Sequence, residues 1–129
     1  MKELIMTINV TTYEAQVLDG PRSKVVMIPF SAVASGEYFN GRTIADGVDT
    51  QVTTADGFTL SARYMLEGTD RSGRKCRLFI QNNGTSLEDC RPRIYTDSDD
   101  LVFLEDAELT AGVECVKNGV VVSIFMRYQ

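Results

Sequence analysis

Residues 37–83 read EYFNGRTIADGVDTQVTTADGFTLSARYMLEGTDRSGRKCRLFIQNN, and this stretch decides the fold. It contains the clearest turn signals in the chain and the most regular alternation of polar and apolar residues. The dipeptide Asp56-Gly57 stands between two extended runs and predicts a two-residue hairpin turn of type I′, whose central residues both need positive φ. In the register that we expect for this hairpin, Asp49 lies opposite Tyr64.

The face pattern of the same stretch predicts which side chains are buried, because successive side chains of a strand point to opposite faces. After a loop near residues 69–73, a further strand is expected over residues 75–82. The apolar face carries Leu60, Ala62, Tyr64 and Leu66, followed by Cys76, Leu78 and Ile80. The solvated face carries Ser61, Arg63, Met65, Glu67, Lys75, Arg77, Phe79 and Gln81. The register also directs Asp49, Gln51 and Thr53 toward the apolar side.

Asp49 is therefore the polar residue that the pattern does not explain. A carboxylate that faces a core must be hydrogen-bonded, paired with a cation, or in contact with a cavity that holds water. In a structural interpretation, Asp49 caps a turn or accepts a hydrogen bond from a buried backbone amide near Gly47. In a functional hypothesis, desolvation raises its pKa and makes it a catalytic general base in a pocket. The Tyr64 hydroxyl would then donate to a developing oxyanion, while Arg63 points away.

The rest of the chain consists of further short strands with no sustained helical period. Strands are predicted over residues 4–11, 13–18, 24–30, 93–96, 110–116 and 117–128. Pro29 indicates an edge or a bulge near the end of its strand. Asn118-Gly119 predicts a second hairpin turn and pairs Val113 with Ile124. The best helix candidate is residues 101–109.

Roughly eight to ten strands at this spacing predict an all-β protein. We expect a single antiparallel closed β-barrel domain over residues 1–129, because closure leaves no sheet edge exposed. A small barrel can hold one ligand in its mouth.

The composition is that of an ordinary soluble domain, with 43% hydrophobic and 24% charged residues in a chain of 129. The net charge of −5 argues against a nucleic-acid surface, which would be basic. No apolar run approaches the ~20 residues that a membrane span needs. The first residues, MKELIMTINV, do not form a signal peptide, so we expect a cytoplasmic protein.

The sequence lacks the residues or motifs that several common kinds of functional site require. Histidine is absent, which removes the commonest general base and the commonest metal ligand. No glycine-rich phosphate loop is present. The acidic residues at 97, 99, 100, 105, 106 and 108 lack the calcium-loop pattern, and a solvated surface explains them better than a hard-cation site does. We therefore expect neither a metal nor a cofactor.

The three cysteines, Cys76, Cys90 and Cys115, are odd in number and lack zinc spacing, which indicates free thiols. Cys76 and Cys115 lie on apolar strand faces and are predicted to be buried and inert. Cys90 lies beside Arg91 in a charged loop and is predicted to be the most reactive of the three.

The order of several short motifs resembles that of the domain-of-unknown-function family 3237. The motifs are the strand at 22–29, the glycine-spaced segment 36–41, DGVD at 46–49, ADG at 55–57, LSARY at 60–64 and NG at 83–84. The family's central pattern is similar to GGADW, so here Asp46, Val48 and Thr50 replace a glycine, the alanine and the tryptophan. Asp49 and Tyr64 match the family's aspartate and tyrosine. The resemblance implies a closed barrel like that of the allene oxide cyclases, often oligomeric, with no established activity.

Two classes of function follow from these observations. The first is a barrel that binds a small apolar or amphipathic molecule, either as a binder or as a cofactor-free isomerase or cyclase. The second is a structural or interaction module with a filled barrel. An apolar pocket of several hundred Å³ lined by Asp49 would favour the first class, and a lumen filled by side chains would favour the second. The expected partners are a small-molecule ligand and further copies of the chain, not nucleic acid or a membrane.

Overall fold

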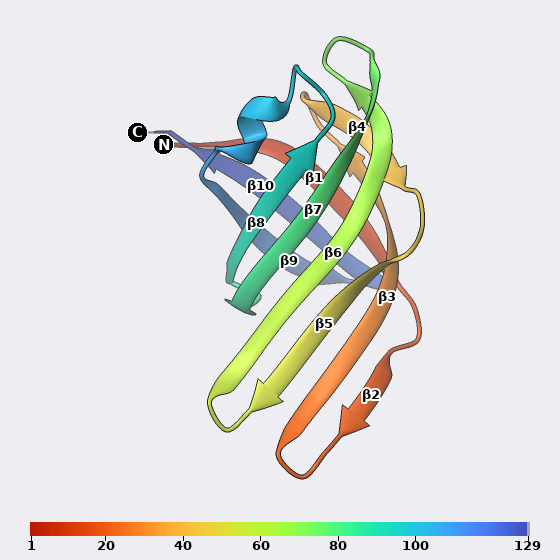
Figure 1. Cartoon of the computed structure of the whole chain (residues 1–129), viewed down its shortest axis with the longest axis vertical. Helices are drawn as coiled ribbons and strands as arrows, with labels where there is room; N and C mark the ends of the chain where they lie inside the picture. The colour runs from red at the N-terminus through yellow and green to blue at the C-terminus, as the bar shows by residue number, and fades with distance from the viewer. Residues whose placement is uncertain (129) are drawn as a thin grey trace.

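Residues 1–128, which this computed structural model describes, form ten strands and one short 3₁₀ helix (Figure 1). The strands are β1 (Lys2–Thr12), β2 (Gln16–Asp19), β3 (Ser23–Ser35), β4 (Phe39–Thr43), β5 (Gly47–Thr54), β6 (Gly57–Asp70), β7 (Lys75–Ser86), β8 (Asp89–Thr96), β9 (Leu109–Val116) and β10 (Gly119–Arg127). The helix is η1 (Val102–Glu105). Every strand pair is antiparallel, and the predicted all-β barrel is confirmed. No helix in the described part of the chain is long and apolar enough to cross a membrane.

The sheet closes on itself through the pairing of β1 with β3. Its strands follow the order β1-β10-β9-β8-β7-β6-β4-β3-β2, and β5 pairs with both β3 and β6. In Figure 1 the β2–β3 and β5–β6 hairpins project beyond the ends of β7 to β10, so one end of the barrel carries a four-stranded extension. Within residues 1–128, β8 and β9 are joined at a single residue pair, Cys90 and Ala111.

Pro29 lies where the long strand β3 changes partners. On one side, β3 pairs with β2 as far as Met27 and with β1 from Phe30 onward. Proline has no N–H to donate, and at this break between two partners no ladder bond is required of it. Its carbonyl accepts a hydrogen bond from the Tyr13 amide at 2.9 Å. The sheet edge predicted at Pro29 is thus a short unpaired gap on one side of β3, between the part that pairs with β2 and the part that pairs with β1.

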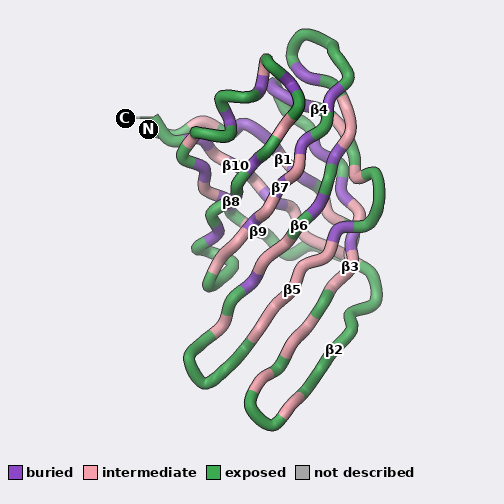
Figure 2. The backbone as a smooth tube through the Cα atoms, in the orientation of Figure 1, coloured by how far each residue is buried: buried purple, intermediate pink, exposed green. Residues whose placement is uncertain are grey.

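One half of the barrel is filled by large apolar side chains. The fully buried ones are Ile5, Met6, Ile8, Phe39, Leu66, Leu78, Ile80, Ile94, Leu101, Leu104 and Ile124. Figure 2 shows buried positions concentrated in the upper part of the molecule, near η1 and β4, and sparse in the projecting hairpins. We call this region the packed half. It fixes the strand directions and so determines where the other half of the lumen lies.

A polar and aromatic cluster covers the packed half where the chain ends meet. Glu3 accepts hydrogen bonds from the hydroxyls of Tyr38, at 2.9 Å, and of Tyr128. The guanidinium of Arg71 lies 4.6 Å from the Tyr38 ring centre and 5.5 Å from that of Phe103. These bonds lower the pKa of Glu3, with the Tyr128 hydroxyl as the largest cause. The cluster joins β1, the β3–β4 connection, the β6–β7 turn, η1 and the residue that follows β10 at this end.

Both predicted hairpins exist, but each turn lies one residue earlier than expected. Ala55 and Asp56 form the first turn, and Gly57, with φ of 134°, begins β6 opposite Thr54. Lys117 and Asn118 form the second turn, in which Asn118 has φ of 66°.

This displacement shifts both registers by two residues, so Val113 pairs with Val122 rather than with Ile124. Because a shift of two preserves the face of every side chain, the predicted faces are right and the predicted partners are wrong.

Two further sequence predictions need correction. The helix candidate at 101–109 contains only the single 3₁₀ turn of η1. The strand expected at 93–96 begins at Asp89, because residues 89–96 pair along β7. Its charged residues point outward in alternation with buried Cys90, Pro92 and Ile94, which makes this strand hard to recognise from composition.

Candidate ligand chamber in the barrel

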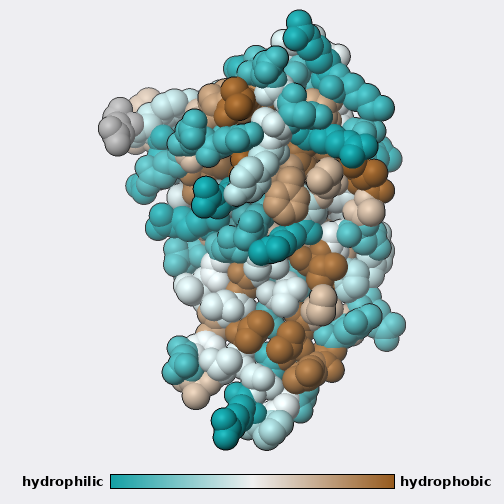
Figure 3. All heavy atoms as spheres, in the orientation of Figure 1, coloured by the Kyte–Doolittle hydropathy of each residue, from teal (hydrophilic) through white to brown (hydrophobic). Residues whose placement is uncertain are grey.

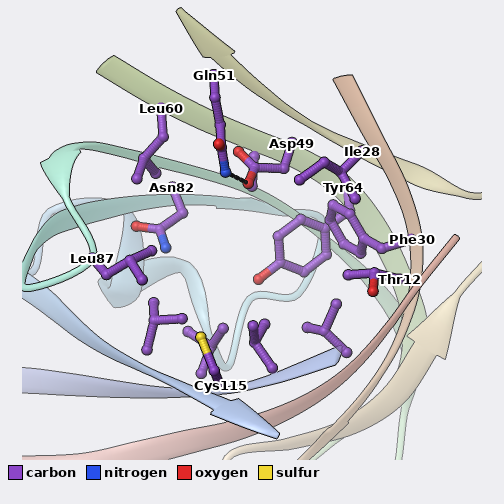
Figure 4. Close-up of a pocket in the computed structure, with 15 residues that line it drawn as sticks. Thr12, Ile28, Phe30, Asp49, Gln51, Leu60, Tyr64, Asn82, Leu87 and Cys115 are labelled. Carbon is purple, nitrogen blue, oxygen red and sulfur yellow. Dashed lines mark hydrogen bonds between the residues drawn. The ribbon is translucent and has the colours of Figure 1, made fainter. Parts of the chain in front are cut away.

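The half of the lumen beyond the packed half holds a cavity of about 260 Å³, which we call the chamber. Eight elements contribute to its wall, among them the β7–β8 turn through Leu87 (Figure 4). Its polar lining residues are Thr12, Asp49, Gln51, Tyr64, Asn82 and Cys115, and the rest are apolar. The packed half is filled by side chains such as Leu66 and Leu78, whereas the same strands and their neighbours place smaller Ala62 and valines around the chamber.

Asp49 and Asn82 face the chamber from strands on either side of β6. Ala62 pairs with Asp49 on β5 and with Asn82 on β7, so the three residues form one row across the sheet. Neighbouring strands lie ~4.8 Å apart, which separates the two polar residues by roughly 10 Å at the backbone. The methyl group of Ala62 leaves the space between their side chains open.

The Asp49 carboxylate is only partly satisfied by the protein. Its Oδ2 accepts a hydrogen bond of 2.9 Å from Nε2 of Gln51, two residues along the same face. Its Oδ1 is buried and has no partner within residues 1–128. Burial raises the pKa of this carboxyl group, and the Gln51 bond opposes that rise. Asp49 thus holds its proton more tightly than an exposed aspartate does.

Tyr64 is fixed by an aromatic contact that depends on Gly47. Phe30 pairs with Gly47, and a Cβ on that glycine would lie 2.6 Å from Tyr64 Cβ and 2.7 Å from Phe30 Cζ. The two rings meet edge to face over the glycine, with centres 5.1 Å apart and planes at 74°. Burial raises the pKa of Tyr64, so its hydroxyl keeps its proton. Figure 4 shows this hydroxyl directed into the chamber.

The structure brings both predicted site residues to one chamber but does not pair them. Asp49 lies opposite Ala62, which makes Tyr64 its diagonal neighbour on β6. The predicted pairing of Asp49 with Tyr64 is therefore wrong, although diagonal neighbours ~7–8 Å apart are still within reach of an aromatic side chain. Arg63 is exposed and lies on the outer face, as predicted.

Asn82 is the chamber residue that the sequence argument missed. It is 5% exposed, and its Oδ1 has no hydrogen-bond partner within the described chain. The signal was available, because the alternation of Cys76, Leu78 and Ile80 on the core face reaches Asn82 next. Because the strand was predicted to end at Asn82, this residue was not assigned to the core face.

Two of the three cysteine predictions are wrong. Cys76 is buried as expected, and burial raises its pKa to about 11. Cys90 is also buried, at 2% exposure, and its thiol donates to the Ser86 carbonyl at 3.3 Å, while burial raises its pKa. Cys115 is the exposed one, since β9 carries it past the packed half to the rim of the chamber.

Several of the acidic residues near η1 have protein partners. Asp97 accepts a hydrogen bond from the Arg77 amide at 2.8 Å, and Glu105 accepts one from the Thr96 amide at 3.1 Å. Asp100 lies 3.3 Å from Arg71 in an ion pair. Among residues 1–128, no three cysteine or acidic side chains form a group that could hold a metal ion.

No family model matches the chain, so the resemblance to family 3237 stays a prediction. A segment of 60 residues, 45% of this chain, is 38% identical to a UPF0311 protein of Clostridium acetobutylicum, and the match spans 35% of that relative's length.

Solved structures resemble the whole chain. A protein of unknown function from Clostridium acetobutylicum has a TM-score of 0.82 at 21% identity, covering 99% of both chains. An enzyme from Penicillium herquei has a TM-score of 0.74 at 15% identity, covering 98% of this chain and 92% of that one. A β-barrel-like protein from Acinetobacter baumannii has a TM-score of 0.70 at 16% identity, covering 98% and 96%. The chain therefore shares its β-barrel fold with these three proteins. The first has no known function, the second is called an enzyme, and the third is described only by its barrel.

Proposed function

We propose that this protein binds a small apolar or amphipathic molecule inside the barrel. The observation that carries the proposal is the chamber of about 260 Å³, with its apolar wall and one polar row. Ligand pockets have this composition, and this volume lies just below their usual range of ~300–1,000 Å³, which indicates a small ligand. A filled structural module is disfavoured, because side chains occupy only one half of the lumen.

Within this proposal, Asp49 and Tyr64 are catalytic residues of a cofactor-free isomerase or cyclase. Burial raises the pKa of Asp49, which makes its carboxylate a stronger base toward an acidic C–H or O–H. Burial also keeps the Tyr64 hydroxyl protonated, so it can donate to a developing oxyanion. Their diagonal placement suits a substrate that spans the two groups rather than one held between touching side chains. The fold shared with a fungal enzyme is compatible with this chemistry.

We further propose that the chain belongs to family 3237, works in the cytoplasm and assembles with copies of itself. The order of motifs along residues 22–84 supports the family. An apolar row of Leu18, Val25 and Val52 crosses the outer face of the extension beside Met27, and Leu18 and Met27 are exposed. Figure 3 shows apolar side chains gathered on this part of the surface, over the lower halves of β3 and β5. Exposed apolar patches of this kind mark interfaces between proteins.

Native mass spectrometry of the purified protein tests the binding proposal. We expect a co-purified small molecule, released on denaturation, with a mass that fits the chamber. A protein that carries no adduct, and that takes up no member of a library of small apolar compounds, would contradict it.

A further inference from the structure

Asn82 offers the chamber a hydrogen-bond donor. Its oxygen is buried, whereas Figure 4 shows its amide nitrogen on the side of the cavity. The neighbouring Cys90 agrees with this orientation. Burial raises the pKa of that thiol, and Asn82 opposes the rise, as the N–H groups of an amide do beside a thiolate. An amide nitrogen carries two N–H groups, so one remains for a ligand when the other faces the sulfur.

The Tyr64 hydroxyl is a second donor in the same space. It is directed into the chamber (Figure 4), and burial raises its pKa, so the group keeps its proton. Ala62 pairs with Asn82, and Tyr64 follows Ala62 by two residues on β6. Tyr64 and Asn82 are therefore diagonal neighbours on one face of the sheet, a separation of ~7–8 Å at the backbone that an aromatic side chain can bridge. The two donors can converge on one acceptor atom.

The acceptor that fits these two donors is an uncharged oxygen. Of the described residues that line the chamber, Asp49 is the one with a charged side chain, and neither lysine nor arginine is among them. A ligand carboxylate would place a second negative charge beside Asp49 with no cation to offset either. A carbonyl oxygen has two lone pairs and no net charge, so it can accept from both donors without that repulsion.

We propose that the chamber takes a carbonyl compound, namely a small apolar ketone, whose oxygen accepts hydrogen bonds from Nδ2 of Asn82 and from the Tyr64 hydroxyl. The carbon next to the carbonyl group lies over Ala62, toward Asp49 at the other end of the row. This inference rests on the proposed function and names its substrate class. It also adds Asn82 to the catalytic residues.

This placement suits the general-base role of Asp49. A C–H group next to a carbonyl is acidic, because the electron pair of the broken bond moves onto the oxygen. Asp49 takes the proton, and the enolate oxygen gains its negative charge where the two donors already point. In an unsaturated ketone the proton can return from Asp49 to a different carbon, which shifts the double bond. The reaction is then an isomerisation that consumes no oxidant, reductant or co-substrate.

Two probes of the same shape test the assignment. One is cyclohexanone labelled with carbon-13 at the carbonyl, and the other is methylenecyclohexane, in which a CH₂ group replaces the oxygen. Each is titrated at neutral pH into the full chain, with affinity read from protein NMR shifts. We expect the ketone to bind about tenfold more tightly, because the hydrocarbon would bury two donors without an acceptor. The carbonyl resonance of the bound ketone should lie downfield of its position in an apolar solvent, as hydrogen bonding to its oxygen requires.

Two variants remove the donors one at a time. Asn82→Leu also removes the buried oxygen that lacks a partner, so the variant should fold without loss of stability. Its preference for the ketone should fall to about threefold or less, and part of the downfield shift should disappear. Tyr64→Phe keeps the ring contact with Phe30 and should remove the other part. Asn9→Leu is the matched control, because it makes the same change at an exposed position of β1 outside the chamber and should leave both readouts intact.

The outcomes distinguish this inference from the proposed function. If both probes bind equally well, or if the bound carbonyl resonates where it does in an apolar solvent, the ketone assignment is overturned while the binding proposal stands. A preference and a shift that survive unchanged in either Asn82→Leu or Tyr64→Phe also overturn it, since the altered residue would then not be a donor. If neither probe shifts a chamber resonance, this inference fails, and the binding proposal fails with it only if native mass spectrometry also finds no ligand.

Discussion

Asp49 on β5 and Asn82 on β7 lie in one row on either side of Ala62, both line the chamber, and each has one buried oxygen without a hydrogen-bond partner in residues 1–128. The two residues are 33 positions apart in the sequence, yet the β6 strand between them sets their spacing. The small side chain at the centre of the row keeps it accessible, which leads to the first prediction.

Ala62→Leu should fill the gap between Asp49 and Asn82 and abolish ligand binding. The larger side chain has room in the chamber, so we expect thermal stability to change by no more than about 1 kcal/mol, below the usual cost of overpacking a filled core. Thr59→Leu, on the exposed outer face of the same strand, is the control and should bind normally. Normal binding by Ala62→Leu would place the ligand elsewhere.

Asp49→Asn should stabilise the protein in a way that depends on pH. Because burial raises the folded-state pKa of Asp49, the carboxyl group favours folding below its unfolded pKa, and that contribution is lost as pH rises through the folded pKa. The variant should therefore melt at the same or a higher temperature than the wild type near neutral pH. The difference should shrink as the pH approaches about 4, the ordinary range for an aspartate.

Thermal unfolding across that pH range measures the effect. A variant that is much less stable than the wild type at neutral pH would instead support the structural interpretation, in which Asp49 holds a turn or a backbone amide. Loss of binding without loss of stability would support the functional hypothesis.

Gly47→Ala should be strongly destabilising, because the new methyl group would collide with Tyr64, Phe30 and the Arg63 carbonyl at 2.6 to 2.9 Å. Relief of such contacts in a packed region typically costs about 1–3 kcal/mol. Gly112→Ala is the control, since a Cβ there meets nothing within 4 Å. Urea denaturation of both variants measures the cost, and equal midpoints would show that the Phe30–Tyr64 contact does not depend on the glycine.

Thiol labelling of the native protein should modify Cys115 first. Cys76 and Cys90 are buried, and burial raises the pKa of both thiols, which disfavours the reactive thiolate. Because Cys115 lines the chamber, a bound ligand should slow its modification. Mass spectrometry of digested protein identifies the site, and Cys115→Ser should remove the fast phase. Rapid labelling of Cys90 would mean that the β7–β8 turn opens.

Asp70→Asn should reduce stability at neutral pH and flatten the loss of stability in acid. The carboxylate accepts hydrogen bonds from the Ser98 hydroxyl at 2.8 Å and from the amides of Ser72 and Arg74 at 2.9 and 3.1 Å. The Ser98 bond is the largest cause of the lowered pKa of Asp70. A lowered pKa stabilises the fold above the unfolded value and loses that effect as pH falls through the folded value. Chemical denaturation at neutral and acidic pH measures how the free energy of unfolding changes with pH. Asp99→Asn is the control at an exposed position.

The faces of the strands could be predicted from alternation, whereas the register could not. Asp49, Gln51 and Tyr64 line the chamber as their positions in the pattern predict. The partner of Asp49 was wrong because Asp56-Gly57 fits a type I′ turn, while the chain turns one residue earlier and uses Gly57 for its positive φ. A local dipeptide cannot distinguish these two turns, since the choice between them depends on the pairing of whole strands.

The division of the barrel interior into a packed half and a chamber could not be predicted from the sequence either. Alternation identifies inward side chains but does not say whether they meet across the barrel. That outcome depends on how side chains from non-adjacent strands meet, as when Val113 on β9 and Ala62 on β6 line the same chamber. The exposure of Cys115 was mispredicted for a similar reason, because it depends on how far along β9 the residue lies. Cys90 was mispredicted because residues 89–92 were expected to form a loop and belong to β8 instead.

The pairing of β1 with β10 has a consequence for synthesis of the protein on the ribosome. β1 lacks one of its two neighbours until residues 119–127 have left the exit tunnel, because β10 supplies that neighbour. The same late strand brings Val120 and Val122 to the chamber wall. The barrel wall therefore closes only when β10 has paired with both β1 and β9, and the chamber can enclose a ligand only from that point.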